Sequence, residues 1–172
     1  TIVSRRMNPN DSVVVSITAF DAPGGYNVIQ DSVTLRGTVR YLSMDNQEPI
    51  YEEMERLVKG LEVTYGVECT LDYVYDYPVL YNTPEIIDEI EETLSESAGS
   101  YFEKVYRDKP QAASEDFAYY LQEKPGAFIF VGAKPEGVEN AYPNHHPKFE
   151  VNEKSLIISA KAMADIILKK IQ

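Results

Sequence analysis

The residues best suited to chemistry are His145 and His146, which stand side by side and are the only two histidines of the sequence. Pro143 and Pro147 flank them. Because proline fixes the backbone and removes a donor, this stretch is predicted to be an ordered loop, and loops on a rigid scaffold carry many binding and catalytic residues. An imidazole can ligate a metal ion or move a proton near neutral pH. The alternative is a surface turn whose histidines have no role.

A metal site is the first chemistry that these residues could support. His145 would supply an imidazole nitrogen, and Glu115 or Asp116 would supply carboxylate oxygens. A two-metal site needs several such ligands held close together, and one histidine loop with one acidic pair cannot supply them all. Any remaining ligands are therefore expected on a part of the protein outside this sequence.

Acyl transfer is the second possibility. The stretch from His145 to Glu150 approximates the His-His-x-x-x-Asp pattern of condensation-type acyltransferases, in which His146 would be the general base. The match is imperfect because the last position is Glu150. A Ser-His-Asp hydrolase is not supported, because the sequence has no Gly-x-Ser-x-Gly elbow.

Composition limits the class of protein. The 172 residues suffice for one ordinary domain or two small ones, and a content of 44% hydrophobic and 26% charged residues is typical of a globular protein. A net charge of -12 argues against nucleic acid and anionic membranes as partners, since both require a basic face. No apolar run is long enough to span a bilayer. The single cysteine, Cys69, favours a reducing cytoplasm.

The first half of the chain is expected to be a small α+β unit. Strands are predicted at 13–20, 33–41 and 67–75, and the alternation in the second strand places Arg40 on its polar face. In the third strand, Cys69 falls on the apolar face and is interpreted as a small core residue. A helix between the second and third strands is expected to begin at Asp45 or Asn46, to hold Pro49 in its first turn and to end at Gly66.

The second half alternates helices with short strands, as in a layered α/β domain. One helix is expected to begin at Thr83 and Pro84 and to expose an acidic face. A brief helix is expected to be capped by Ser114, with Glu115 and Asp116 in its first turn. Strands are predicted at 103–106 and 127–131. A last helix carries the following apolar residues on one side: Leu156, Ile157, Ala160, Met163, Ala164, Ile167 and Leu168.

Five short motifs occur in one order along nearly the whole chain. They are Asn27-Val28-Ile29-Gln30-Asp31-Ser32, Leu35-Arg36-Gly37-Thr38-Val39-Arg40, Ser114-Glu115-Asp116-Phe117-Ala118, Pro125-Gly126-Ala127-Phe128 and His145-His146-Pro147-Lys148-Phe149. In this order they resemble the C-terminal half of the metal-dependent amidohydrolases and peptidases that include hippurate hydrolase, aminoacylase and the auxin-conjugate hydrolases.

The resemblance implies an α/β fold in two domains. Residues 1–77 would form most of a small α+β, ferredoxin-like lid that also dimerises, and residues 78–172 would be the C-terminal part of a layered α/β catalytic domain. A chain that begins at Thr1 is then expected to be a piece of something longer.

The resemblance also assigns roles to three residues. His145 opens the His-x-Pro motif and would be a metal ligand, whereas His146 falls on a variable position. Asn27 and Arg40 would contact polar groups of the substrate, which agrees with the polar face predicted for Arg40. The sequence departs from the usual pattern of the family at Gln30, at Ala113 and in the turn at Asp21 and Pro23. These departures affect the expected identity of the substrate more than the expected membership of the family.

The implied activity is hydrolysis of the amide bond of N-acyl amino acids or small peptides, with two divalent metal ions (zinc, manganese, cobalt or nickel) that activate a water molecule. The other metal ligands and the glutamate that serves as general base lie upstream in this family, so no catalytic residue and no tightly bound metal are expected in this piece alone. A homodimer formed through the lid is also implied. A non-catalytic dimerisation and binding module is the alternative, and the acyltransferase is the third candidate.

Overall fold

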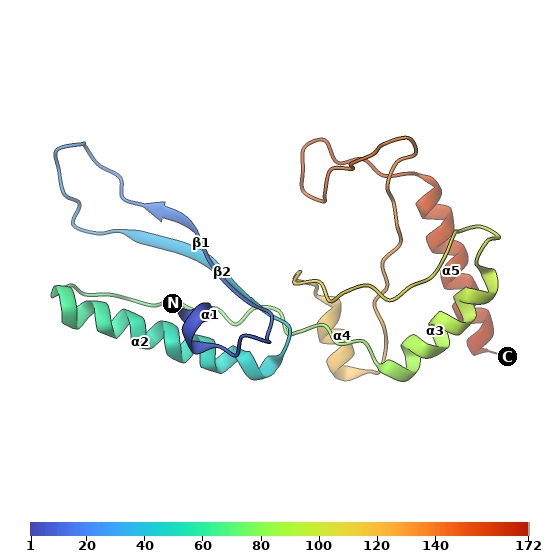
Figure 1. The fold of residues 1–172 in the computed structure, drawn as a ribbon, viewed down its shortest axis with the longest axis horizontal. Coiled ribbons are helices and arrows are strands. Elements are labelled where there is room, and N and C mark those ends of the chain that lie inside the picture. The colour runs from blue at the N-terminus through green and yellow to red at the C-terminus, as the bar shows by residue number, and fades with distance from the viewer. Residues whose placement is uncertain (172) are drawn as a thin grey trace. The chain divides into compact units, whose positions relative to one another are not determined.

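The first two predicted strands pair with each other in the computed structural model, which describes residues 1–171 (Figure 1). β1 (Val13–Asp21) and β2 (Thr34–Tyr41) form an antiparallel hairpin whose register shifts after Ile17. The two strands approach closely at Gly37, where a Cβ atom would lie 2.2 Å from the carbonyl oxygen of Ser16. Only glycine fits there without a shift of the backbone.

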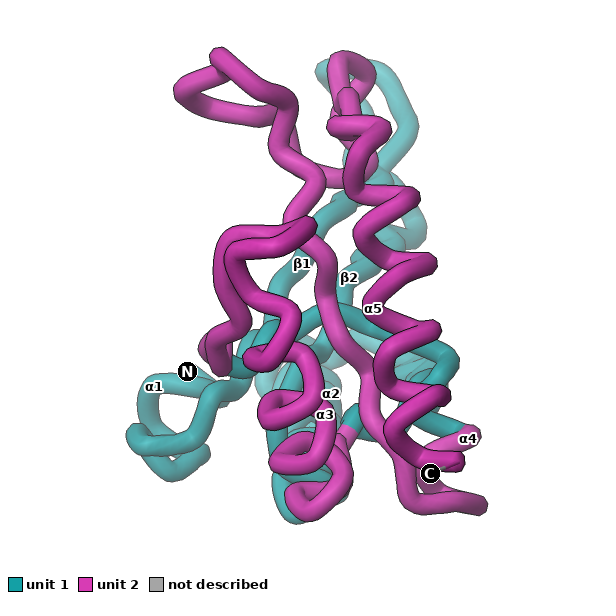
Figure 2. The backbone as a smooth tube through the Cα atoms, turned by 90° about the vertical axis from the view of Figure 1, so that its right-hand side faces the viewer, with its two compact units in different colours: residues 1–80, 110–119 teal, residues 81–109, 120–172 magenta. Residues whose placement is uncertain are grey.

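The chain divides into two units, which are coloured separately in Figure 2. The first unit comprises residues 1–80 and 110–119, and the second comprises residues 81–109 and 120–172. The boundary expected at Tyr77 concerns domains of the whole protein and stays a prediction.

The helix of the first unit agrees with the prediction. The 3-10 turn η1 (Met44–Asn46) leads into α2 (Gln47–Tyr65), and Gly66 ends the helix with a left-handed φ of 64°. Asn46 occupies the N-cap position but makes no capping hydrogen bond with its side chain; it is buried instead. The first turns are anchored by Ile50, the largest fully buried side chain of the described residues.

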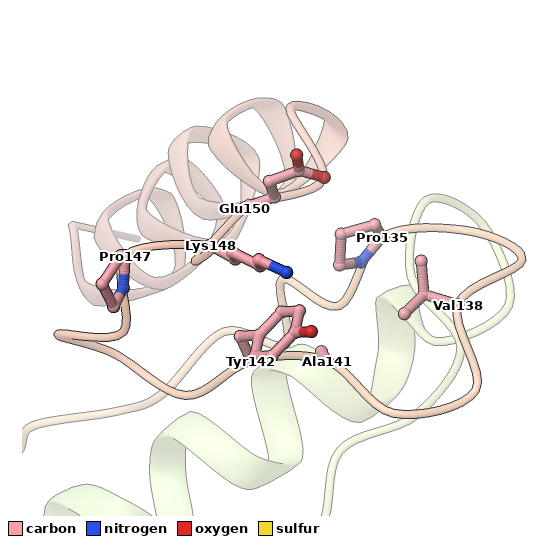
Figure 3. A pocket seen from close by; sticks show the side chains of 7 residues that line it. All are labelled: Pro135, Val138, Ala141, Tyr142, Pro147, Lys148 and Glu150. Carbon is pink, nitrogen blue, oxygen red and sulfur yellow. The ribbon is translucent and has the colours of Figure 1, made fainter.

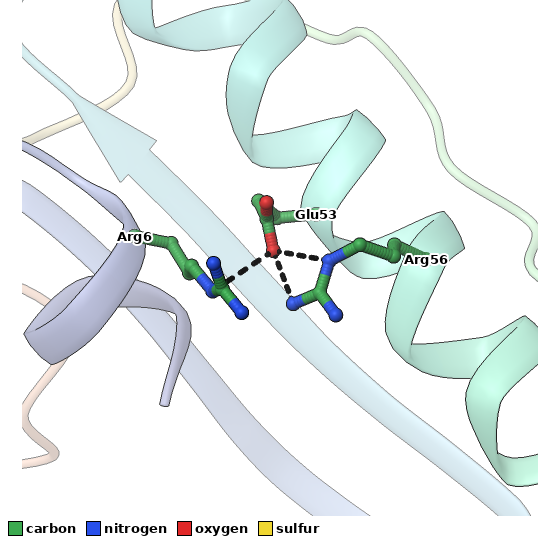
Figure 4. Close-up of polar contacts among 3 residues, drawn as sticks. All are labelled: Arg6, Glu53 and Arg56. Atoms are coloured by element: carbon green, nitrogen blue, oxygen red, sulfur yellow. Dashed lines mark hydrogen bonds and ion pairs between the residues drawn. The ribbon is translucent and has the colours of Figure 1, made fainter.

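The short helix α1 (Ile2–Arg6) packs against α2 and β1. Figure 4 shows the Glu53 carboxylate of α2 between two arginines: Arg56 donates from Nε (2.9 Å) and Nη2 (2.5 Å), and Arg6 lies 3.7 Å away on α1. The hydrogen bonds from Arg56 lower the pKa of Glu53. Both arginines are about half exposed (52% and 50%), so solvent screens these ion pairs and they add little to the stability of the unit.

The third predicted strand, at 67–75, is wrong, because this segment forms no strand pairing with any residue in the range 1–171. It lies along α2: the backbone nitrogen of Cys69 donates to the Glu62 carboxylate (2.9 Å), and Tyr73 and Tyr75 contact the ring of Tyr51. The alternation is still visible, since Cys69 and Tyr73 are half-buried. The pattern therefore predicted the inward side correctly for the middle of the segment, whereas Val67 and Tyr75 are exposed, and the side faces a helix and not a strand.

The second unit is built on α3 (Pro84–Ser97) and α5 (Lys154–Lys170), which pack together. Thr83 and Pro84 begin α3 as predicted, although the Thr83 hydroxyl accepts from the backbone nitrogen of Gly126 (3.1 Å) instead of capping the helix. Leu94 of α3 and Ala162 of α5 are buried, whereas the acidic side of α3 is mostly exposed as expected.

The strands predicted at 103–106 and 127–131 are also wrong. The second of these segments is held by a side chain: Asn82 accepts from the Phe128 nitrogen (2.7 Å) and donates to the Phe128 oxygen (3.0 Å). A side-chain amide thus supplies the two bonds that a neighbouring strand would offer.

The brief helix α4 (Phe117–Glu123) begins later than predicted, so Ser114 does not cap it and neither acidic residue lies in its first turn. The Glu115 carboxylate instead accepts from the backbone nitrogen of Phe117 (3.2 Å), just ahead of the helix.

Helix α5 meets α3 through polar side chains, among them Asp165 with Ser97 and Lys169 with Glu96, and its apolar side is uncovered within the described residues. The exposed members are Leu156, Ile157, Met163, Ile167 and Leu168. No helix within residues 1–171 has both the length and the apolar character needed to cross a bilayer. The mixed α/β class expected from the sequence is confirmed.

Candidate functional site

His145 sits at the corner of a tight turn. The backbone nitrogen of His146 donates to the oxygen of Pro143 (3.2 Å), and His145 occupies the third position of that turn with a φ of 70°. It is the only residue other than glycine with a positive φ among the described residues. The left-handed conformation costs an L-residue roughly 1–2 kcal/mol, and such strain is concentrated at functional positions.

The two histidines differ in what they contact. The ring of His146 stacks on Tyr142, with centroids 4.2 Å apart and planes inclined by 13°, and its Nδ1 accepts from the backbone nitrogen of Lys148 (3.0 Å). Within the described chain, no hydrogen bond or ring contact engages the exposed His145 side chain. Of the pair, His145 is thus the free imidazole and His146 a structural one.

The hydrogen bond at Nδ1 also determines what His146 can do. A neutral imidazole that accepts at Nδ1 carries its proton on Nε2 and has no second lone pair with which to act as a base. The acyltransferase reading required His146 to be that base. The loop geometry therefore gives this alternative no support.

A metal centre needs more ligands than His145. In the described part of the chain, no three His, Cys, Asp or Glu side chains lie close enough together to hold an ion. Glu115 and Asp116 belong to the first unit, whereas His145 belongs to the second. An imidazole nitrogen is a common ligand of zinc and nickel, so His145 fits the role of one ligand in a centre completed by other residues.

Arg40 lies near the base of the hairpin, and its guanidinium Nη1 donates to the hydroxyl of Ser114 (3.2 Å). This contact joins two of the five sequence motifs, which are far apart along the chain. Ser114 was predicted to cap a helix, and its pairing with Arg40 was missed because nothing local in the sequence indicates a partner 74 positions away. A guanidinium has five donors, so Arg40 keeps others for a ligand.

Asn27 lies at the opposite end of the hairpin. It is exposed in a turn closed by the bond from the Val28 nitrogen to the Gly25 oxygen (3.1 Å), beyond the last strand pair, Asp21 with Thr34. Arg40 pairs with Val14 near the other end. Six residue steps of strand separate Thr34 from Arg40, which at about 3.4 Å each is roughly 20 Å. The structure therefore does not bring Asn27 and Arg40 of one chain together.

An open pocket of about 370 Å³ lies beside the histidines within the second unit (Figure 3). Tyr142 and Pro147, which flank the histidine turns, both line it. The complete lining is Pro135, Val138, Ala141, Tyr142, Pro147, Lys148 and Glu150. Nothing in the sequence indicates this pocket, because it forms only where the loop from Pro135 to Glu150 folds back on itself.

The sequence model of peptidase family M20/M25/M40 matches residues 6–169. Among curated proteins, the "Putative amidohydrolase YhaA" of Bacillus subtilis (strain 168) is 39% identical over 163 residues, which is 95% of this chain and 41% of that protein. Other matched relatives are named carboxypeptidases and N-acetyldiaminopimelate deacetylases. The chain thus spans about two fifths of the length of these relatives.

Two solved structures share the fold. A crystal structure of "a putative aminohydrolase from methicillin resistant Staphylococcus aureus" has a TM-score of 0.83 and 48% identity, covering 99% of this chain and 43% of that one. The YXEP protein of Bacillus subtilis, described as a dinuclear metal binding peptidase from the M20 family, has a TM-score of 0.70 and 26% identity over 90% of this chain and 40% of its own. The family match, the fold and the ordered motifs agree, and the chain belongs to peptidase family M20/M25/M40.

Proposed function

We propose that the whole protein hydrolyses the amide bond of N-acyl amino acids or small peptides with the help of two divalent metal ions. The observation that carries the proposal is the geometry of the histidine loop, in which His145 is strained and unengaged while His146 is held by Tyr142 and Lys148. The names of the matched relatives span amidohydrolases, carboxypeptidases and deacetylases, so they support amide hydrolysis without deciding the substrate.

His145 would hold one ion through an imidazole nitrogen, as one ligand among others that this chain does not carry. Zinc, manganese, cobalt and nickel are the candidate ions, since the order of affinity alone does not select among them in cells. When bound, the ions would polarise the amide carbonyl and lower the pKa of a water molecule. The turn that fixes the backbone of His145 limits how far its ring can move, which helps to preorganise the site.

Arg40 and Asn27 would bind the substrate. The guanidinium of Arg40, oriented by Ser114, would bind the carboxylate of the amino acid through two parallel hydrogen bonds. Asn27 would donate its amide to a carboxylate or to the carbonyl oxygen as negative charge develops there. Their separation along the hairpin suggests that they serve different active sites, as a homodimer formed through the lid would allow.

Three further aspects are part of the proposal. The net charge of -12 supports an enzyme that binds neither nucleic acid nor an anionic membrane. The single cysteine supports a cytoplasmic location. The activity is proposed to be of the aminoacylase or hippurate hydrolase type, because the substrates of such enzymes carry a free carboxylate, which Arg40 would bind.

The test compares Arg40→Lys with the unchanged protein on N-benzoyl amino acids and on their C-terminal amides. Lysine presents a point charge where arginine presents a planar fork. Loss of a charge-assisted bond costs about 1.5–3 kcal/mol, so the KM for the acids should rise about tenfold or more, while the KM for the amides stays nearly unchanged. Equal losses on acids and amides would make Arg40 a structural residue, and absence of metal-dependent turnover by the unchanged protein would refute the proposed function.

A further inference from the structure

The loop that carries the two histidines is closed at its base by a backbone hydrogen bond, in which the Asn152 nitrogen donates to the Ala133 oxygen (2.8 Å). Further out, the loop is held only by itself. Within residues 1–171, the hydrogen bonds and ring contacts of residues 141–149 are all with one another. The contacts that fix the position of His145 must therefore be found inside this stretch.

Two successive turns present His145. The first is closed by the bond from the His146 nitrogen to the Pro143 oxygen (3.2 Å), and the second by the bond from the Phe149 nitrogen to the His146 oxygen (2.9 Å). His145 lies in the first turn with a φ of 70°, a conformation that an L-residue adopts only at a cost. Contacts that hold these turns are therefore needed to keep His145 in this conformation.

Tyr142 makes such contacts with both turns. Its ring stacks on His146, which the two turns share, and the ammonium of Lys148 in the second turn lies 5.7 Å from the centroid of the ring. Figure 3 shows the Lys148 side chain extending over the ring. Stacked rings attract each other, and a ring face attracts a cation. Loss of either partner leaves the other in place, whereas loss of the ring removes both contacts.

We propose that Tyr142 is a positioning residue for the metal ligand: its ring holds His146 and Lys148 and thereby fixes the direction of the His145 imidazole. This role rests on the proposed function, because it presumes that His145 binds a metal ion. The ordering of the loop by the ring, in contrast, needs no metal. The Tyr142 hydroxyl forms no hydrogen bond with any residue in the range 1–171, so the ring alone carries the role.

The test compares three variants of the whole protein. Tyr142→Leu removes the ring but keeps an apolar side chain in the wall of the pocket, and Tyr142→Phe keeps the ring and removes only the hydroxyl. Tyr106→Leu is the matched control. Tyr106 is also exposed, and the Lys104 ammonium lies 5.2 Å from the centroid of its ring, but it belongs to a segment outside the histidine loop.

The first measurement is the rate at which trypsin cleaves the metal-free protein after Lys148, followed by mass spectrometry. Tyr142→Leu should open the loop more often and speed this cleavage about threefold to tenfold, the factor expected for a lost ring contact. Tyr142→Phe and Tyr106→Leu should be cleaved at the rate of the unchanged protein.

The second measurement is the affinity for zinc, obtained by competition with a chelating indicator, together with kcat and KM on N-benzoyl amino acids. Residues that support a metal ligand are worth 10–100-fold in affinity, so Tyr142→Leu should weaken zinc binding about tenfold. At a fixed zinc concentration it should lower kcat and leave KM unchanged. Tyr142→Phe should restore both the affinity and kcat. A purely structural role would lower the midpoint of thermal unfolding without changing the zinc affinity.

The outcomes separate the two proposals. Zinc affinity or cleavage after Lys148 that Tyr142→Leu does not change would overturn the positioning role, even if the protein hydrolyses its substrates as proposed. Zinc binding that Tyr142→Leu weakens and Tyr142→Phe restores, without turnover by any of the proteins, would sustain the positioning role and refute the hydrolysis. An unchanged protein that binds no zinc would contradict both.

Discussion

At the scale of single residues, the two adjacent histidines should behave differently when removed. In the whole protein, His145→Ala should lower the metal content and reduce activity by more than about a hundredfold, because even partners that only support a metal ligand are worth 10–100-fold. His146→Ala removes a ring that stacks on Tyr142, which should cost at most about 1.5 kcal/mol of stability and leave the metal in place.

Metal analysis after dialysis, with rates measured on the same samples, distinguishes the two variants. His146→Phe is the control, because it can keep the stack on Tyr142 while losing the hydrogen bond from Lys148. If His146→Ala lost the metal and His145→Ala kept it, the metal ligand would be His146 and not His145.

A feature of the site could be predicted from the sequence where residues nearby along the chain determine it. It could not be predicted where it depends on a contact that forms only in the folded protein. Strand alternation placed Arg40 on a polar face, and that inference needs only its neighbours. Its partner Ser114 could not be found because their contact forms only when the chain folds. The strain at His145 is equally invisible, since a stretch with two prolines predicts a turn but not which residue takes the positive φ.

At the scale of elements, one carboxylate of α5 binds both the last residue of α3 and the turn that follows it. Asp165 of α5 accepts from the hydroxyls of Tyr101 (2.6 Å) and Ser97 (2.7 Å), and these two hydrogen bonds lower its pKa. Because the folded-state pKa is lowered, the stabilisation is present above the unfolded-state pKa of about 3.9 and is lost as the pH falls through the folded-state value.

Asp165→Asn should therefore reduce the stability of the second unit at pH 7 and make little difference near pH 2. Urea denaturation followed by circular dichroism across this range measures both quantities. Tyr101→Phe, which removes one of the two donors, should also reduce the stability at pH 7, by part of the loss seen in Asp165→Asn, and should make little difference near pH 2. A destabilisation by Asp165→Asn of equal size at every pH would contradict the charged hydrogen bonds.

The helices were predicted better than the strands, for a physical reason. Helix ends are determined by nearby residues: Gly66 ends α2 in a left-handed conformation, and Thr83 with Pro84 begins α3. A strand also requires a partner. Alternation identified the inward face of the segment at 67–75 but could not reveal that this face meets α2 and its Tyr51. The same limitation explains the segment at 127–131, whose hydrogen bonds go to Asn82.

At the scale of the whole molecule, the apolar side of α5 shows what periodicity leaves open. The spacing of Leu156, Ile157 and Ile167 predicted one apolar side, and these residues do lie exposed, at 66%, 61% and 53% of their accessible surface. Periodicity says which side is apolar but not what covers it. The polar contacts with α3 come instead from Asp165, which accepts from Ser97, and from Lys169, which pairs with Glu96. The pattern that identified the helix therefore did not identify the contacts that the helix makes with α3.

The hairpin leads to a prediction about assembly. Asn27 at its tip and Arg40 near its base are about 20 Å apart by strand length, too far to bind one small substrate. Each strand pairs only with the other within the described residues, so both outer edges are open to another copy. If both residues bind substrate, Asn27 is expected to act on the metal centre of the partner subunit.

Mixing whole-length His145→Ala with whole-length Asn27→Ala tests this arrangement, because each homodimer should be nearly inactive. In a mixed dimer, the subunit that keeps His145 receives an intact Asn27 from its neighbour. Random exchange gives half mixed dimers, each with one working site, so about a quarter of the unmixed activity should return. Arg40→Ala mixed with His145→Ala is the control: Arg40 serves its own chain on this view, so that mixture should recover nothing. Exchange confirmed by mass spectrometry, without recovery in the Asn27 mixture, would show that Asn27 serves its own subunit or none.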